Sequence, residues 1–419
     1  MLKVIHVCWA DDKGGAFIGA RRLHQAFLKD PRFDSSLLVL HKFTQNIEKI
    51  KRIQRSRFTR KLYSTISGLL RKAVKSDNQI TRSFNIVPTG LAGQINALRP
   101  DIVQFHWVGN DTISLWEIPW LEAPVVWKLP DMWPFSGSAH YPLPGFEDWY
   151  SHEENIRDKL PYDSGLNVEK YMTLLKRIIL RNANINFVGP SRWITDLVSE
   201  SYLFKGRPST HIINPINSEI WRKSKSHLAR SNYDISDDDF VILFSSIDAL
   251  GDPRKGYQHL ENIFSELALM TLPKNLKCAV IGHEGASYNV HGIKCVPLGR
   301  TFDEKALSEL YNIGDLFVFP SIMDNLANTI KEATCCGLPC VAFNIGGNGD
   351  MIRDGVNGFL IKPFDTKDFA IKIAQLMKMD SKEFNAISAK TEEMAHALHS
   401  ESTATEHYHK FYNKILGSI

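Results

Sequence analysis

The chain of 419 residues is long enough for two or three domains, and its 43% hydrophobic and 23% charged residues are typical of a globular protein. A net charge of +4 does not by itself indicate nucleic-acid binding, and no apolar run approaches the roughly 18 residues of a transmembrane helix. The six cysteines show no metal-ligand spacing, so we expect small buried thiols in a reducing, cytoplasmic compartment.

The first residues predict a strand, a glycine loop and a helix. The apolar stretch before Trp9 is too short for a signal peptide and is not followed by a cleavage site. Gly14 and Gly15 come next, without the G-x-G-x-x-G spacing of a dinucleotide site. This loop is either a tight turn or a place where backbone N–H groups face a phosphate or an acceptor.

A basic segment from Lys51 to Lys75 contains no acidic residue. Its cations alternate with apolar side chains, namely Ile53, Phe58, Leu62, Tyr63, Ile66, Leu69 and Leu70. One interpretation is a solvated helix face over the core. Another is docking on anionic lipid headgroups, where each cation adds about 1 kcal/mol. No recognition module accompanies the segment, so we expect no nucleic-acid partner.

Two segments in the first half, Asp101–Trp107 and Ala123–Tyr141, each predict a buried strand that ends in a polar, aromatic loop. An α/β fold places its site at the carboxyl ends of its strands. His106, Asp131 and His140 are therefore candidates for acceptor binding or base chemistry, and a structural role is the alternative for each of them.

The first half is predicted to end with a helix, a strand and a polar linker. The helix covers Val168–Arg181, the strand covers Ile185–Val188, and Ser191 is expected to cap the helix that follows. Between Ser224 and Asp239 the composition becomes polar and charged, which indicates a domain linker. We interpret the acidic run that ends the linker as a solvated turn and not as a metal site.

The second half repeats the strand–helix rhythm. Strands are predicted at Phe240–Ser246, Lys277–Ile281 and Cys295–Leu298. Arg254 and Lys255 precede a helix start near Tyr257, which predicts a phosphate clamp of two cations at a helix N-terminus. Parallel strands that end in glycine in both halves predict an α/β fold of two doubly wound domains facing a cleft.

The most informative stretch runs from Phe319 to Gly347. A buried strand over Leu316–Phe319 leads into a polar turn with Asp324, and Glu332 lies in the helix that follows. A second strand is predicted over Cys340–Phe343. Two carboxylates and free backbone N–H groups around one crevice suit a molecule with many hydroxyls and a phosphate. Farther on, Ala395–Ile419 is predicted to be one helix with an apolar face.

This stretch resembles the signature of the retaining glycosyltransferases of family four, which have the GT-B fold. It is most similar to bacterial enzymes of exopolysaccharide and O-antigen (lipopolysaccharide) assembly. Supporting motifs are Gly14–Ala16, Asp131–Tyr141, Pro190–Trp193, Ile213–Asn217, Pro253–Gly256 and Asp354–Leu360. The resemblance implies an acceptor-binding Rossmann-like domain over residues 1–220, with a crossover helix at 396–419, and a nucleotide-sugar-binding domain over residues 221–395.

The resemblance also implies roles for individual residues. Glu332 would bind the ribose of the donor, and Asp324 would contact the transferred sugar. Lys255, helped by Arg254, would neutralise the departing nucleoside diphosphate, whose negative charge grows in an oxocarbenium-like transition state. Backbone N–H groups beside the sugar and diphosphate would come from Gly15, Ala16, Asn325, Leu326 and Ala327. No metal and no cofactor other than the nucleotide-sugar donor are expected.

The chain departs from the family pattern at Asp324, where glutamate is usual, at Pro130, where histidine is usual, and near Ser245–Asp248, where a Gly-Arg pair is usual. The main hypothesis is a metal-independent retaining hexosyltransferase. It would act on a lipid-linked saccharide and sit peripherally on the inner face of the plasma membrane through Lys51–Lys75. The alternatives are a sugar-nucleotide-binding homologue with impaired catalysis and a nucleotide-sugar 2-epimerase, which shares the fold.

Overall fold

The computed structural model describes residues 1–77, 81–224, 228–245 and 252–417. It divides into two compact units. Unit 1 comprises Met1–Pro215 and Glu401–Ile419, and unit 2 comprises Ile216–Ser400. The boundaries expected from the sequence are 220 and 396, so unit 2 begins earlier and ends later than expected. Residues 225–227 of the expected linker and 246–248 of the departing segment lie outside the described residues.

Unit 1 is built on a seven-stranded sheet with the order β3-β2-β1-β4-β5-β6-β7, in which every pairing is parallel. Every residue of β4, β5 and β6 is buried, as is typical of parallel strands covered on both faces. The strands are β1 (Leu2–Ala10), β2 (Phe33–His41), β3 (Ile50–Arg52), β4 (Ile102–Phe105), β5 (Val125–Lys128), β6 (Ile185–Gly189) and β7 (Ser209–His211).

The helices of unit 1 include the two that the sequence predicts around β6. The helix α5 begins at Val168, and Ser191 Oγ caps α6 by accepting a hydrogen bond from Ile194 N at 3.3 Å, so both predictions are confirmed. The helices are α1 (Gly15–Lys29), α2 (Arg57–Ala73), α3 (Leu91–Asn96), α4 (Glu153–Arg157), α5 (Val168–Leu180), α6 (Arg192–Glu200) and α14 (Glu401–Leu416), with the 3-10 helices η1 (Leu115–Trp120) and η2 (Trp149–Ser151).

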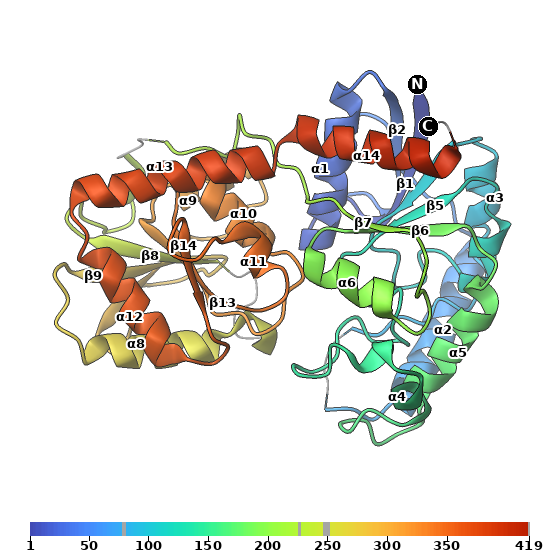
Figure 1. The fold of residues 1–419 in the computed structure, drawn as a ribbon, viewed down its shortest axis with the longest axis horizontal. Coiled ribbons are helices and arrows are strands. Elements are labelled where there is room, and N and C mark those ends of the chain that lie inside the picture. The colour runs from blue at the N-terminus through green and yellow to red at the C-terminus, as the bar shows by residue number, and fades with distance from the viewer. Residues whose placement is uncertain (78–80, 225–227, 246–251, 418–419) are drawn as a thin grey trace. The chain divides into compact units, whose positions relative to one another are not determined.

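The C-terminal helix α14 lies across unit 1 beside α1 (Figure 1). Tyr408 and Tyr412 of α14 are buried, and both rings meet Phe27 of α1 edge-on. The hydroxyl of Tyr412 also donates a hydrogen bond of 2.6 Å to Gln104 on β4. The predicted return of the last helix to the N-terminal domain is confirmed. The single helix predicted from Ala395 is wrong, because α13 (Ser381–Leu398) ends before α14 begins.

Unit 2 is built on a second seven-stranded sheet, with the order β10-β11-β9-β8-β12-β13-β14. Its strands are β8 (Phe240–Ser245), β9 (Leu276–Ile281), β10 (Tyr288–Val290), β11 (Ile293–Pro297), β12 (Leu316–Phe319), β13 (Cys340–Phe343) and β14 (Gly358–Ile361). The bounds of β12 and β13 are those predicted. The edge strand β10 was not predicted; it pairs antiparallel with β11 through a two-residue turn, His291-Gly292, with φ values of 49° and 83°.

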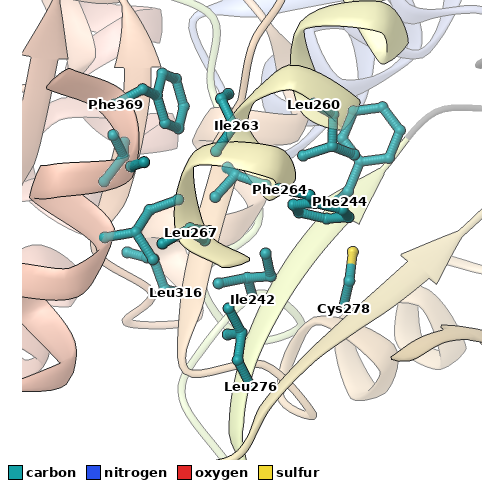
Figure 2. Packing of buried hydrophobic residues seen from close by; sticks show 14 of the residues in the cluster. Ile242, Phe244, Leu260, Ile263, Phe264, Leu267, Leu276, Cys278, Leu316 and Phe369 are labelled. Carbon is teal, nitrogen blue, oxygen red and sulfur yellow. The ribbon is translucent and has the colours of Figure 1, made fainter. Parts of the chain in front are cut away.

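The core of unit 2 lies between the sheet and the helices that cover it. Figure 2 shows Leu260, Phe264 and Leu267 of α8 packed over Ile242 and Phe244 of β8. The remaining elements of the unit are helices α7 (Leu228–Ser231), η3 (Pro253–Lys255), α8 (Tyr257–Ala268), α9 (Glu304–Tyr311), α10 (Asn328–Cys335), α11 (Asn348–Met351), α12 (Thr366–Met377) and α13.

Two further features bear on the chemistry of the chain. All six cysteines are buried and free, which confirms the prediction of buried thiols. In the part of the chain that the structure describes, no helix is both long enough and apolar enough to cross a bilayer.

Candidate functional site

The candidate site of unit 2 begins where two loops meet at the carboxyl end of β12. Gly256 has a φ of 71°, and a Cβ on it would lie 1.9 Å from the carbonyl oxygen of Pro320. Ser321 Oγ donates a hydrogen bond of 2.6 Å to the carbonyl of Arg254. Only a glycine permits this close approach of the two backbones. The junction therefore holds Lys255 beside the turn that follows β12.

Two of the predicted residues form an ion pair at this junction. Lys255 Nζ lies 3.0 Å from Asp324 Oδ2, and both side chains are partly buried, at 30% and 18% exposure. Gly346, with a φ of 49°, would place a Cβ 1.8 Å from the carbonyl oxygen of Asp324, so the loop after β13 also packs on this turn. The structure thus brings the predicted cation and the predicted sugar-contacting carboxylate together.

Arg254 is paired with a carboxylate of its own turn. Its Nε lies 3.0 Å from one carboxylate oxygen of Asp252, and its terminal nitrogen lies 2.7 Å from the other. Asp252 also caps η3 by accepting a hydrogen bond from Arg254 N at 3.1 Å. The phosphate clamp of two cations stays a prediction, in which Arg254 is already paired within its own turn. Lys255 is the cation that faces Asp324.

Glu332 lies on α10 and is buried, at 4% exposure. The hydroxyl of Tyr311, at the end of α9, donates a hydrogen bond of 3.2 Å to Glu332 Oε2. Burial raises the pKa of Tyr311 well above its ordinary value, with the Glu332 carboxylate adding to the shift, so the phenol keeps its proton. Sequence analysis missed Tyr311.

The backbone before α10 remains a candidate anion site. Ala327 is the N-cap residue and no side chain caps the helix there, and the first turn carries no acidic residue. The positive end of the helix dipole therefore meets no carboxylate from its own N-cap or first turn. The predicted contribution of backbone N–H groups from Asn325, Leu326 and Ala327 stays a prediction that this arrangement supports.

In unit 1, Asp131 and His140 lie together in a buried network. His140 Nδ1 lies 2.6 Å from Asp131 Oδ2, and His140 Nε2 lies 2.8 Å from Ser83 Oγ. Trp107 Nε1 donates a further hydrogen bond of 2.8 Å to Asp131 Oδ2. Both ring nitrogens of His140 are engaged with protein groups, which favours a positioning role over the predicted base or acceptor contact.

A pocket in unit 1 gathers other predicted residues. Its lining includes Gly15, Ala16, Gly19, His106, Lys128 and Pro130. The helix α1 starts at Gly15 with no side-chain cap and no acidic residue in its first turn. The structure therefore brings the predicted glycine loop together with His106 and Pro130.

Lys128, at the end of β5, is the residue of this pocket that sequence analysis missed. It is only 4% exposed, and burial lowers the pKa of its amine to about 7. The sequence did contain a signal for Lys128. A lysine at the end of the short apolar strand Val125–Lys128 lies at the carboxyl end of the strand, where the site was predicted.

We expect Lys128→Met to raise the free energy of unfolding. The buried amine binds its proton more weakly in the folded chain than in the unfolded chain, where the pKa is near 10.5. Lys128 therefore lowers stability as the pH falls from about 10.5 to about 7, with no further loss below that range. Urea denaturation near pH 6.5 and near pH 9.5 should show a larger gain at the lower pH. A variant less stable than the parent at both values would contradict this expectation.

The acidic run Asp237–Asp239 is not wholly a solvated turn. Asp237 and Asp238 are exposed, but Asp239 is buried and its carboxylate lies 2.8 Å from Lys277 Nζ. Among the residues that the structure describes, no three His, Cys, Asp or Glu side chains are grouped as metal ligands would be.

Two Rossmann-like α/β units with site loops at the carboxyl ends of their strands define a protein of the GT-B class, as predicted. Solved structures agree over nearly the whole chain. Anabaena Alr3699/HepE, solved in complex with UDP and glucose, has a TM-score of 0.66 at 15% identity and covers 100% of both chains. WaaG, a glycosyltransferase involved in lipopolysaccharide biosynthesis, has a TM-score of 0.64 at 13% identity, covering 99% of this chain and 100% of that one.

Sequence comparison identifies the family of the second unit. Residues 229–394 match the family of glycosyl transferases group 1, which confirms the resemblance to family-four glycosyltransferases. The N-acetyl-alpha-D-glucosaminyl L-malate synthase of Bacillus anthracis is 20% identical over 79% of this chain and 89% of its own length. The sulfoquinovosyl transferase SQD2 of Arabidopsis thaliana is 39% identical over 18% of this chain. That match spans only 16% of the length of SQD2.

Proposed function

We propose that the chain transfers a hexose from a nucleoside-diphosphate sugar to a saccharide acceptor, with retention of configuration and without a metal. The observation that carries this proposal is the ion pair of Lys255 and Asp324 at the junction held by Gly256. Binding of UDP and glucose by the Anabaena protein of the same fold supports a nucleotide-sugar donor.

The arrangement in unit 2 suits the departure of a diphosphate. Cleavage of the bond between the anomeric carbon and the diphosphate oxygen moves negative charge onto the leaving group. Lys255 is the cation placed to neutralise that charge, while Asp324 holds its ammonium group in position at 3.0 Å. Glu332, oriented by Tyr311, is the carboxylate that we assign to the ribose hydroxyls.

The donor is tested by incubating the full chain with UDP-, GDP- and dTDP-sugars and measuring nucleotide release. Glu332→Gln should lower kcat/KM for the best donor by roughly tenfold or more, because an amide replaces a charged acceptor in a buried site. Gln keeps the size of Glu and an oxygen for the Tyr311 hydroxyl, so the fold should be retained.

The matched control is Glu309→Gln, on the exposed surface of α9 in the same unit, which should leave kcat/KM unchanged. Equal turnover by Glu332→Gln and the parent would remove Glu332 from the site. If the chain binds UDP but releases no nucleotide from any donor, the alternative of a non-catalytic sugar-nucleotide-binding homologue gains support.

We further propose that the acceptor is lipid-linked and that unit 1 contacts a membrane surface. Leu62 and Leu69 of α2 are 38% and 63% exposed, and exposed Lys61 and Lys72 lie on the same helix. The buried face of α2 is fixed to the unit through Tyr63, whose hydroxyl donates a hydrogen bond of 2.5 Å to the carbonyl of Val87. The side chains of residues 57–60, including Phe58, lie outside the described residues.

A second exposed apolar stripe lies on α5. Tyr171, Leu174 and Ile178 recur at helical spacing and all are exposed, Ile178 at 74%. The segment before α5 is hydrogen-bonded to the end of α2, since Leu166 N donates a hydrogen bond of 3.2 Å to the carbonyl of Ala73. Apolar side chains and cations on neighbouring helices are the composition of a membrane-surface contact.

The membrane contact predicts salt-sensitive binding to vesicles. The full chain should co-sediment with vesicles of anionic phospholipid at low salt, and much less at high salt or with neutral phospholipid. Leu69→Ser combined with Lys72→Glu should weaken binding by roughly tenfold or more, because the pair loses an apolar contact and reverses one charge.

The control for the apolar contact is Leu269→Ser, since Leu269 is 84% exposed in unit 2 and should not matter. Vesicle binding that is insensitive to salt and to the α2 substitutions would contradict the proposed membrane contact. The assignment of the nucleotide-sugar donor would not be affected.

A further inference from the structure

Two lysines, Lys128 and Lys176, are buried in the described part of unit 1. The ammonium group of Lys176 has a full set of hydrogen-bond acceptors. Its Nζ donates hydrogen bonds of 3.0 Å to Ser136 O and 2.8 Å to Gly137 O, and a third to Trp133 O. It also lies 4.3 Å from the centre of the Trp133 ring. Burial lowers the pKa of its amine to about 7, while the carboxylates of Glu169 and Asp131 favour its charged form. The amine of Lys176 therefore has a structural role, since its hydrogen bonds hold one loop.

Lys128 is buried without a comparable set of partners. Among the described residues, its Nζ donates a single hydrogen bond, of 3.4 Å to Gly19 O, and it forms no ion pair. The group that most favours its charge is Cys8, whose thiol has its pKa raised to about 11 by burial and therefore carries no charge at neutral pH. A lysine that could be charged thus lies in the pocket with no anion beside it.

His106 lines the same pocket and has one ring nitrogen that lacks a hydrogen-bond partner among the described residues. It is 2% exposed, its Nε2 lies 2.9 Å from His6 Nδ1, and the unpartnered nitrogen is Nδ1, as far as the described residues show. When His6 Nδ1–H is the donor of that bond, His106 Nδ1 carries a proton and can donate. Burial lowers the pKa of His6 and of His106 well below the ordinary value. Both rings are therefore uncharged near pH 7 and need no counter-ion.

The rest of the pocket has no carboxylate, and Asn214 adds a side-chain amide to its lining. The first residues of α1, Gly15 and Ala16, bring the positive end of a helix of 15 residues to it, and Pro130 contributes an apolar wall. The enclosed part of the pocket measures only about 20 Å³ and opens to solvent, so it suits one small group and not a whole saccharide. An ammonium group, a ring nitrogen and a helix N-terminus in such a space fit an oxyanion.

We propose that Lys128 and His106 form a subsite for a carboxylate or phosphate group carried by the sugar substrate, so that the protein takes an acidic sugar in preference to a neutral one. The inference rests on the proposed function of sugar transfer. It assigns to Lys128 the choice of substrate at a pocket that Pro130 also lines.

The subsite predicts that binding and protonation are linked. An anion that contacts Lys128 favours the protonated amine, so its affinity should fall as the pH rises through about 7. The titratable groups that interact with Lys128 are Cys8, His6 and His106, with His24 behind them. The shifts of Cys8, His6 and His106 keep these groups neutral near pH 7, and the pKa of His24 is also lowered, so Lys128 dominates the change.

The test measures binding of glucuronate, glucose 6-phosphate and glucose to the full chain by ligand-observed NMR, with UDP as a separate probe. These sugars differ only in the group at carbon 6. At least one anionic sugar should bind about tenfold or more tightly than glucose, and Lys128→Met should abolish this preference without changing UDP affinity. For glucuronate, whose charge is constant over the range, binding should weaken about tenfold between about pH 6 and about pH 8.5.

Preference for glucuronate identifies a carboxylate, and preference for glucose 6-phosphate identifies a phosphate. Equal binding of the three sugars, or a preference that survives in Lys128→Met, would overturn the inference. Loss of UDP binding in Lys128→Met as large as the loss of the anionic sugar would also overturn it, because Lys128 would then serve the diphosphate. A parent chain that binds no UDP and turns over no donor would instead defeat the proposed function.

Discussion

Replacing Lys255 with alanine is expected to lower kcat/KM for nucleotide release by roughly 10- to 100-fold. The substitution removes a charge-assisted contact of about 1.5–3 kcal/mol from the departing diphosphate. It also leaves Asp324 without its partner at 3.0 Å, so a carboxylate faces the leaving group without a counter-charge. Steady-state kinetics with the best donor from the nucleotide-sugar panel would measure the effect.

Two comparisons make this result specific. Lys305→Ala, at an exposed position on α9 of the same unit, should leave kcat/KM unchanged. Arg254→Ala should have a smaller effect than Lys255→Ala, because the Arg254 guanidinium is already paired with Asp252. If Lys255→Ala retained parental turnover, the assignment of Lys255 to the leaving group would be wrong.

The substitution Gly256→Ala is expected to destabilise unit 2 by about 3 kcal/mol or more and to abolish turnover. Alanine would have to adopt a φ of 71°, and its Cβ would stand 1.9 Å from the carbonyl oxygen of Pro320. The backbone conformation alone costs about 1–2 kcal/mol, and the contact forces the two loops apart. Guanidinium denaturation followed by far-UV circular dichroism would measure the loss of stability.

Gly292→Ala separates the two parts of this cost. Gly292 has a φ of 83°, but an added Cβ would find nothing within 4 Å. The Gly292→Ala variant should lose only about 1–2 kcal/mol of its free energy of unfolding and keep full activity. If the two variants lost equal stability, the close approach of Gly256 to Pro320 would not hold the site together.

Much of the fold could be predicted because the apolar runs and the Gly and Pro residues that bound them indicate the same strand limits. The strands over Leu316–Phe319 and Cys340–Phe343 are short apolar runs bounded by Gly and Pro, and both have the predicted limits. The edge strand β10 could not be found in this way. It has three residues, and its turn, His291-Gly292, is not one of the common hairpin pairs.

The site was less predictable, because a sequence shows which groups are present and not which of them pair. Lys255 and Asp324 were expected near one crevice, and they are joined at 3.0 Å. The pairing of Arg254 with Asp252 was missed, since two residues in a turn of three can face each other or face away. Lys128 was missed for a related reason: the last residue of a strand can point into the core, into a pocket or into solvent.

The position of α14 affects the order in which the chain can fold. Tyr408 and Tyr412 complete the core around Phe27 of unit 1, yet they follow the whole of unit 2 in the sequence. As the chain leaves the ribosome, the first unit must wait with its apolar surface over α1 uncovered until the second unit has been synthesised. Each unit has its own core, but the core of unit 1 cannot be completed until unit 2 has been translated. The unit that is translated first is therefore the last to complete its folding.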